Sequence, residues 1–257
     1  MRSHLGLFLI VSLLLISGMG FAQELQTRSV ISIGTQFFQL KDQKNYGLVF
    51  NGGNISVEYT LQKLTGQNFF RYDAAFGLGA GFSKGIAGIN LHLKPAGFSY
   101  LFPLVSNGKA VLYIGPYLTM NYFFQMYPEL QSGHALWFTF YDAGPRFMVD
   151  TRLKDQAFRV QFANSLIGMV SRPTEMNETY FYTLIFFNQV EKVHSNFKVG
   201  SFGLLNHPDF ELEWRQIGNS NKSLAYQLEY FCFNTEPRLQ YLVHAISFCI
   251  MLGKENK

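Results

Sequence analysis

Residues 110–124 read Ala-Val-Leu-Tyr-Ile-Gly-Pro-Tyr-Leu-Thr-Met-Asn-Tyr-Phe-Phe, and every second side chain in this stretch is apolar. Successive side chains of a β-strand point to opposite faces, so this alternation predicts a strand with one continuous apolar face. Such a strand is typical of a barrel wall that meets hydrocarbon outside and a polar interior inside. The apolar face comprises Ala110, Leu112, Ile114, Pro116, Leu118, Met120, Tyr122 and Phe124, and the opposite face comprises Val111, Tyr113, Gly115, Tyr117, Thr119 and Asn121.

The N-terminal residues have the pattern of a secretory signal peptide. Arg2 supplies a positive charge, residues 5–16 are mostly apolar, and Gly20-Phe21-Ala22 fits a cleavage site. The apolar run is shorter than the roughly 20 residues of a spanning helix, which disfavours the alternative of an uncleaved anchor. We therefore expect residues 1–22 to be a cleaved signal peptide and residues 23–257 to form one domain without helical membrane spans.

The composition favours a membrane barrel over a soluble β domain. Aromatic residues make up 17% of the chain and charged residues only 15%, whereas soluble surfaces normally carry more charge. The net charge of +4 is mild and is not concentrated in a basic run, so we expect no nucleic-acid partner. Aromatic residues that we expect in girdles at the membrane interfaces are Tyr72, Tyr117, Tyr122, Trp137, Tyr141, Tyr226 and Tyr230.

The same alternation recurs elsewhere in the chain. In residues 70–82, aromatic and aliphatic residues alternate with Arg71, Asp73 and three glycines. Residues 210–215 alternate Phe, Leu and Trp with Glu, Glu and Arg, and residues 223–230 alternate Leu and Tyr with polar or small residues. In residues 156–170 the pattern is broken by Asn164, which falls on the apolar face. These segments predict further strands with one lipid-facing side.

Turn-forming residues between these segments predict an all-β, closed antiparallel transmembrane β-barrel of about twelve strands. An even number of strands returns both termini to the same side of the membrane. Ten strands fit if residues 189–206 form a loop. The predicted strands are residues 28–40, 46–62, 68–83, 86–104, 110–125, 135–151, 156–170, 178–190, 197–206, 209–217, 222–234 and 238–252.

In these features the chain resembles the small single-domain outer-membrane β-barrel proteins of Gram-negative bacteria. The resemblance rests on the strand pattern of the whole mature chain and on the signal ending near Ala22-Gln23, and no specific motif supports it. It implies an outer-membrane location, contact with outer-membrane lipid and lipopolysaccharide, and insertion by the barrel-assembly machinery. Such proteins typically end on an aromatic residue, whereas this chain continues past Phe248 to Gly-Lys-Glu-Asn-Lys at residues 253–257.

The polar faces of the predicted strands carry a nearly balanced set of ionisable residues. Buried charges are tolerated when they are paired, so one interpretation is a salt-bridged lattice that fills the lumen. The other is a polar pore or a substrate pocket, with room near the inward Gly77, Gly79 and Gly81. The predicted lumen-lining residues are Glu58, Arg71, Asp73, His92, Lys94, Asp142, Arg146, Arg159, Glu211, Glu213, Arg215 and Glu229.

No catalytic or metal-binding motif stands out. The segments 194–196 and 206–209 combine His with Ser, Asn or Asp, but we place both at turns. His92 with Glu58 or Asp73 is a further acid–base candidate. No His-x-His, Cys-x-x-Cys or phosphate-binding glycine pattern occurs, so we expect neither metal nor cofactor.

The two cysteines are not expected to form a disulfide. In a hairpin with a turn near residues 235–237, Cys232 faces about residue 240 and Cys249 faces about residue 223. The two thiols are then about 30 Å apart along the sheet, well beyond bonding distance. We expect two buried, unpaired thiols.

The sequence supports three functional hypotheses. The leading one is a non-enzymatic, porin-like outer-membrane barrel, either a narrow channel or a structural membrane component. The second is a barrel enzyme that acts on lipid or lipopolysaccharide, whose catalytic residues the sequence does not identify. The third is a secreted soluble β-barrel that binds an apolar ligand.

Overall fold

The computed structural model describes residues 26–45, 47–107, 109–128, 134–173, 194, 196–216 and 221–252. The predicted signal peptide and the predicted strand at 178–190 lie outside these residues. Over the described residues the chain is all-β apart from one 3-10 turn, η1 (Gln43–Asn45). None of these residues belongs to a helix with the length and hydrophobicity of a membrane span.

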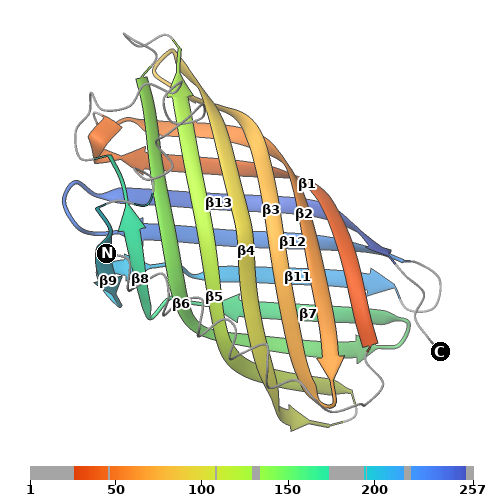
Figure 1. Cartoon of the computed structure of the whole chain (residues 1–257). Helices are drawn as coiled ribbons and strands as arrows, with labels where there is room; N and C mark the ends of the chain where they lie inside the picture. The colour runs from red at the N-terminus through yellow and green to blue at the C-terminus, as the bar shows by residue number, and fades with distance from the viewer. Residues whose placement is uncertain are drawn as a thin grey trace.

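Long antiparallel strands form most of the fold, and short ones lie in its second half (Figure 1). The first six strands are β1 (Gln26–Asp42), β2 (Val49–Thr65), β3 (Asn68–Ser83), β4 (Ile86–Ser106), β5 (Ala110–Tyr127) and β6 (His134–Leu153). The others are β7 (Gln156–Ala163), β8 (Ile167–Ser171), β9 (Lys198–Ser201), β10 (Leu205–Asn206), β11 (Asp209–Gln216), β12 (Lys222–Phe233) and β13 (Leu239–Leu252).

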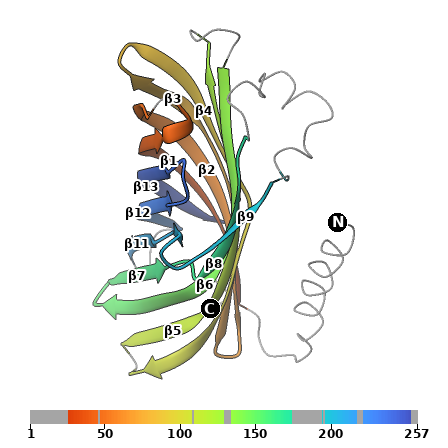
Figure 2. The same cartoon turned by 90° about the vertical axis from the view of Figure 1, so that its left-hand side faces the viewer.

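The strands close into an antiparallel barrel of ten strand positions. β5 pairs with β6 and β1 pairs with β13, so the sheet has no free edge at either place. β7 and β8 both pair with β6, one after the other, and therefore occupy one position. β11 pairs with β7, β9 pairs with β8 (Figure 2), and both β10 and β11 pair with β12, so these three strands share another position.

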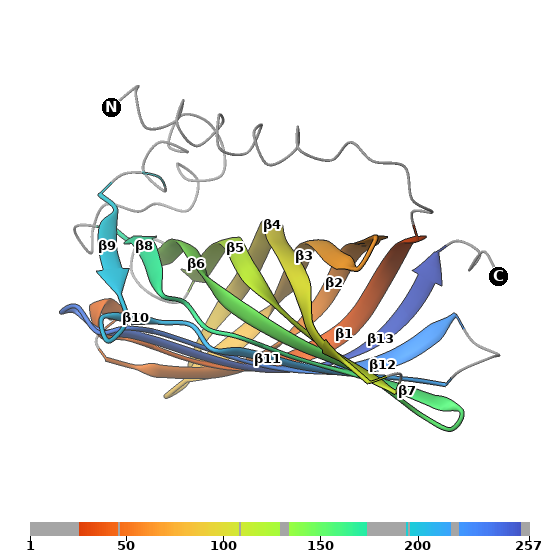
Figure 3. The same ribbon diagram turned by 90° about the horizontal axis from the view of Figure 1, so that it is seen from below.

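The structure therefore has ten strand positions, which is the lower of the two predicted counts, and not about twelve. Residues 189–206 are not simply a loop, since 198–201 and 205–206 form short strands in line with β11. Figure 1 shows the strands of the front wall crossing those of the rear wall, and Figure 3 shows the two walls from below. Strong strand tilt of this kind is what closure of a small barrel requires.

The two ends of the barrel differ in their connections. The start of β1 and the end of β13 lie side by side, because Ser29 pairs with Leu252. We call this the terminal end; β2, β4, β6 and β11 end here, and the next strand of each begins after two to five intervening residues in the sequence. At the opposite end, the loop end, β1, β3, β5, β8 and β12 end, and the next strand of each begins after as few as two residues (β3 to β4) and as many as 26 (β8 to β9).

The alternation in residues 110–124 places one face of β5 inside the barrel and the other outside, as predicted. Tyr117, Thr119 and Asn121 are buried inside the barrel, whereas Pro116 on the other face is exposed. β3, β11 and β12 follow their predicted faces in the same way, with Arg71, Asp73, Glu213 and Glu229 buried. The side on which each of these strands meets the interior was therefore predicted correctly from the sequence.

The alternation fails between β7 and β8. Gln161 and Ala163 are buried at odd positions of β7, but Val170 is buried at an even position of β8. Residues 164–166 interrupt the strand and reverse its facing, as an irregularity in a barrel wall does. The prediction of one regular strand over 156–170 is wrong at this point, and Asn164 marks the break.

Two expected girdle residues are buried. Tyr117 is only 4% exposed and faces the interior, and Trp137 is also 4% exposed and packs against Phe124. Tyr117 lies in the middle of β5 and its hydroxyl group donates to Asp142, so its aromatic character did not indicate which face it occupies.

The cysteine prediction is confirmed. Cys232 pairs with Gln240 and Cys249 pairs with Ser223 in the β12–β13 ladder. Both thiols are free and buried.

Candidate functional site in the barrel interior

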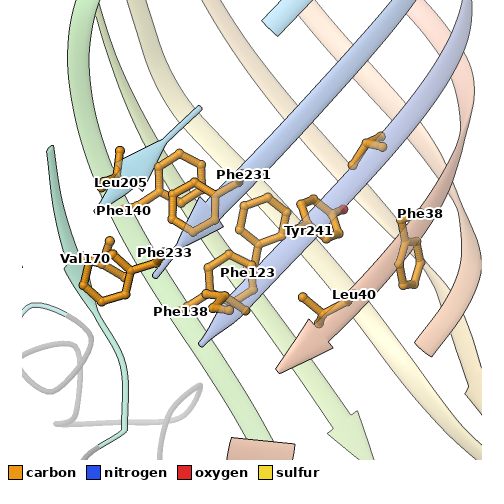
Figure 4. Close-up of a cluster of buried hydrophobic side chains, with 12 residues drawn as sticks. Phe38, Leu40, Phe123, Phe138, Phe140, Val170, Leu205, Phe231, Phe233 and Tyr241 are labelled. Carbon is orange, nitrogen blue, oxygen red and sulfur yellow. The ribbon is translucent and has the colours of Figure 1, made fainter. Parts of the chain in front are cut away.

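Near the loop end the interior is filled by an aromatic cluster, shown in Figure 4. The rings of Phe123 on β5 and Tyr241 on β13 have centroids 4.6 Å apart, although the two strands lie on opposite sides of the barrel. Phe140 on β6 stacks on Phe231 of β12 at 4.1 Å. The aromatic cluster comprises Phe38, Leu40, Phe123, Phe138, Phe140, Val170, Leu205, Phe231, Phe233, Leu239, Tyr241 and Val243.

The space beside the inward glycines is occupied. A Cβ atom on Gly81 would lie 3.0 Å from the ring of Phe38, and one on Gly77 would lie 3.1 Å from Oε1 of Gln36. At Gly79 a Cβ atom would lie 1.9 Å from the carbonyl oxygen of Gly53. These glycines admit close approach of β1 side chains and β2 backbone, and leave no opening in the wall.

Below the aromatic cluster, His207 lies between two carboxylates. Its Nδ1 is 3.0 Å from Asp142 and its Nε2 is 2.9 Å from Glu229, and the Tyr117 hydroxyl group donates to Asp142 at 2.7 Å. His207 is 5% exposed. An imidazole held on both nitrogens by acids is a bridging cation and has no nitrogen left to accept a proton from a substrate.

The sequence pattern predicts a turn at His207, and this prediction is wrong. Residues 207–208 interrupt the strand between β10 and β11, but the pairing with β12 continues in register across the gap. Pro208 lacks an amide hydrogen and explains the interruption. The turn-forming residues around His207 masked its inward position.

Towards the terminal end, Arg71 is the centre of a charged network that we define as Glu58, Arg71, Asp73, Lys94 and Glu211. Its guanidinium group contacts Glu58 at 3.2 Å, Asp73 at 3.2 Å and Glu211 at 2.7 Å. Lys94 forms a further ion pair with Asp73. The bond from Arg71 on β3 to Glu211 on β11 crosses the full width of the lumen.

A second set of polar contacts crosses the lumen nearer the terminal end. Arg159 on β7 binds both carboxylate oxygens of Asp150, at 2.7 and 2.9 Å, and donates to Gln62 on β2 at 2.7 Å. Arg28 pairs with Glu213 at 3.0 Å. Bidentate arginine–carboxylate pairs of this kind hold a fixed geometry, so this layer is rigid as well as polar.

The structure brings most of the predicted lumen-lining residues into these layers, in combinations that the sequence did not specify. Arg146 lies between Ser99 at 2.9 Å and Asp209 at 3.5 Å. His92 does not join Glu58 or Asp73; it stacks on Phe123 and bonds to Asn121 at 3.1 Å. Arg215 is half-buried near the rim and contacts the sulfur of Met251 at 3.7 Å.

Several interior residues are absent from the set predicted from the sequence, three of them with a role in the layer nearest the terminal end. Arg28, Gln62 and Asp150 lie near strand ends, where facing is hard to assign. Their inward orientation could have been found by extending the alternation of each strand outwards from its centre.

The cavities between these layers are unequal in size. In the middle of the barrel, beside Glu58 and Arg71, the cavity volume is about 30 Å³, the space of a single water molecule. A cavity of about 350 Å³ lies at the terminal end, and one of about 440 Å³ lies beside Arg172 and Phe233 at the loop end. Over the described residues, no group of three or more His, Cys, Asp or Glu side chains is arranged to hold a metal ion.

The outer surface is apolar. Large hydrophobic side chains are exposed around the wall, among them Phe37 at 61%, Ile55 at 67% and Phe76 at 47%. A soluble monomer rarely exposes contiguous apolar surface on this scale, whereas a membrane barrel requires it.

No protein-family model matches the sequence, and no curated protein matches it either. Solved structures with a similar fold are outer-membrane barrels of Gram-negative bacteria. The outer-membrane protease OmpT from Escherichia coli has a TM-score of 0.46 at 6% identity, with 91% of this chain and 99% of that chain covered. The translocator domain of the autotransporter NalP from Neisseria meningitidis has a TM-score of 0.42 at 5% identity, covering 97% and 96%. The P. putida toluene transporter TodX (TM-score 0.32, 8% identity) covers 91% and 92%. By its own strand pairing the chain is a closed, ten-stranded antiparallel β-barrel, and it resembles outer-membrane barrels.

Proposed function

We propose that this protein is a structural component of the outer membrane, a barrel whose lumen is sealed in its resting state. The observation that carries the proposal is that side chains from opposite walls touch at three levels. These contacts are Phe123 with Tyr241, Arg71 with Glu211, and Arg159 with Gln62. An open pore needs a continuous aqueous path, and these contacts stand across it.

The competing functions receive less support from the same residues. A narrow channel would require the aromatic cluster to separate, which exposes large apolar rings to water. A barrel enzyme that used His207 with Asp142 or Glu229 would require a nitrogen available to the substrate, and both nitrogens of His207 are bonded to these acids. A soluble ligand-binding barrel would not carry side chains such as Phe37 and Ile55 exposed on its outside.

The proposal includes the surroundings of the barrel. Residues 1–22 act as a cleaved export signal, and the assembly machinery inserts the barrel with its terminal end towards the periplasm. The exposed apolar side chains contact lipid and lipopolysaccharide. The short connections at the terminal end and the longer one at the loop end support this orientation, because outer-membrane barrels have short periplasmic turns.

Planar-bilayer conductance tests the sealed lumen. The refolded wild-type barrel should give no discrete conductance steps. Neighbouring rings can fill the space that a single alanine substitution leaves, so the double variant Phe123→Ala/Phe138→Ala is used to open the aromatic cluster. It leaves the contacts of Arg71 and Arg159 across the lumen in place and should stay silent, whereas a variant that adds Arg71→Ala and Arg159→Ala should conduct.

The matched control is Phe37→Ala/Phe76→Ala, which removes two outward rings and should stay silent. Steady conductance of the wild-type protein would overturn the proposal in favour of a channel. Recovery of the protein in the detergent-solubilised outer-membrane fraction, with heat-modifiable gel migration, tests the location. A protein that remains soluble after export would contradict it.

A further inference from the structure

The cavity of about 350 Å³ at the terminal end has a strongly cationic lining. Its lining includes five basic side chains and two acidic ones. The cavity is open at the rim, where Lys109 and Arg152 are exposed. The charged lining residues are Arg28, Lys109, Arg152, Arg159, Arg215, Asp150 and Glu213.

The two acids in the lining are already engaged. Asp150 accepts from Nε and Nη2 of Arg159, and Glu213 accepts from Arg28 and from the hydroxyl group of Ser223 at 2.7 Å. Within the part of the chain that the structure describes, neither Lys109 nor Arg152 has a carboxylate partner. The positive charge at the mouth of the cavity is therefore not neutralised by these described residues.

One buried donor in the lining is also unused. The Nε atom of Arg28 is buried and has no hydrogen-bond partner among the described residues. The atom has almost no surface open to the cavity, so the contribution of Arg28 to a ligand there is its positive charge.

The remaining wall of the cavity is apolar and aromatic. Phe69, Val111, Tyr113 and Phe158 line it, and the Arg159 guanidinium group lies 4.9 Å from the centroid of the Phe69 ring. Apolar walls with a few convergent polar groups are typical of small-molecule sites. The bond between Arg159 and Gln62 crosses the lumen beside this cavity, so binding here does not require passage through the barrel.

We propose that the terminal-end cavity binds a small organic anion, namely a carboxylate or phosphate monoester carried on an apolar or aromatic body. The anionic group lies among Arg28, Lys109 and Arg152, and the apolar body lies against Phe69 and Tyr113. The ligand enters from the aqueous side at the terminal end.

Calorimetric titration of the folded, full barrel in non-ionic detergent tests this proposal. Phenyl phosphate is the probe. Inorganic phosphate supplies the anionic group without the ring, and benzyl alcohol supplies the ring without the anionic group. Phenyl phosphate should bind more tightly than either, and its affinity should fall as salt concentration rises. Failure of the wild-type barrel to bind phenyl phosphate at about 10 mM, well above typical site affinities, would overturn the proposal.

Two variants locate the site. Lys109→Gln/Arg152→Gln should weaken phenyl phosphate binding at least about tenfold. The matched control Lys41→Gln/Lys84→Gln removes two exposed cations at the loop end and should change affinity by less than about twofold. Equal weakening in both double variants would mean diffuse attraction to a cationic protein and would overturn the site.

Two further experiments test the role of the aromatic wall and whether the bound anion is a soluble ligand or a lipid. Tyr113→Leu should weaken binding of phenyl phosphate but leave that of inorganic phosphate unchanged; equal loss of both would contradict a role for the wall. Adding phosphatidylglycerol to the micelles should not displace phenyl phosphate. Displacement would reassign the cavity to a lipid headgroup and overturn the proposal of a soluble ligand.

Discussion

The aromatic cluster near the loop end and the charged network nearer the terminal end close the same lumen through different kinds of interaction. In the aromatic cluster, Phe123 meets Tyr241 through ring contact and excludes water. In the charged network, Arg71 meets Glu211 through a charge-assisted hydrogen bond at 2.7 Å. Both contacts join strands from opposite sides of the ring.

Because their physics differs, the two layers respond to different disturbances. Ring packing loses stability in proportion to the volume removed and is insensitive to salt. A buried ion pair stabilises the folded state only while every partner is present, because an uncompensated charge in a low-dielectric interior raises the free energy of that state. Each ring removed from the aromatic cluster should therefore lower the free energy of unfolding by a limited amount, whereas loss of one member of the charged network should lower it strongly.

The largest effect should come from Arg71→Ala. The substitution leaves the carboxylates of Glu58, Asp73 and Glu211 close together without their shared cation, and it should lower the free energy of unfolding by about 3–5 kcal/mol. Urea unfolding of the folded barrel in detergent measures it. Arg238→Ala is the control, since Arg238 pairs with Glu236 on the exposed surface and should cost less than about 1 kcal/mol. Equal losses in the two variants would contradict a special role for the buried network.

Phe123→Ala should follow, with a loss of about 3 kcal/mol, because it leaves a cavity among Phe138, Phe140 and Tyr241. The loss should be the same at low and high salt, measured by the same urea titration. Phe37→Ala removes an equal ring from the outer face, where detergent or lipid fills the vacated space, and should cost much less. A strong salt dependence for Phe123→Ala would break the contrast between the two layers.

His207→Gln should cost about 2 kcal/mol, since an uncharged amide cannot compensate both Asp142 and Glu229. Thermal unfolding of the variant, compared with His244→Gln, measures the difference. His244 is exposed and bonds to Tyr226 at 2.8 Å, so its replacement should have a small effect. If His207→Gln proved as stable as the wild type, the bridging role of His207 would be wrong.

The smallest effect should appear in the reactivity of the two thiols, which lie towards the two ends of the barrel. Cys232 is on β12 towards the loop end, on the opposite face of the strand from Phe231 and Phe233, and bonds to Asn234, whereas Cys249 accepts from Ser32 in the polar half at 3.2 Å. In single-cysteine variants, 1 M salt should raise maleimide labelling of Cys249 by roughly twofold and leave that of Cys232 unchanged. Equal acceleration at both thiols would mean that the barrel opens as one unit.

Much of this arrangement could be predicted from the sequence where a regular pattern extended over a strand. The facing of β3, β5, β11 and β12 follows from alternation, and the pairing of Cys232 with residue 240 follows from the position of one turn. The predictions failed at irregular places. The interruptions at residues 164–166 and 207–208 change what a strand presents to the interior, and a two-residue period contains no signal for them.

The amino-acid pattern alone was enough to establish a β-barrel, the apolar face of most strands, and an interior of nearly balanced charge. These properties are local, since each depends on neighbouring residues along a strand. Three others emerged only in the folded barrel: the ten positions of the ring, the bond between Arg71 and Glu211, and the contact between Phe123 and Tyr241. Partners across a lumen depend on the number of strands and on their stagger, and both are fixed only when the last strand pairs with the first.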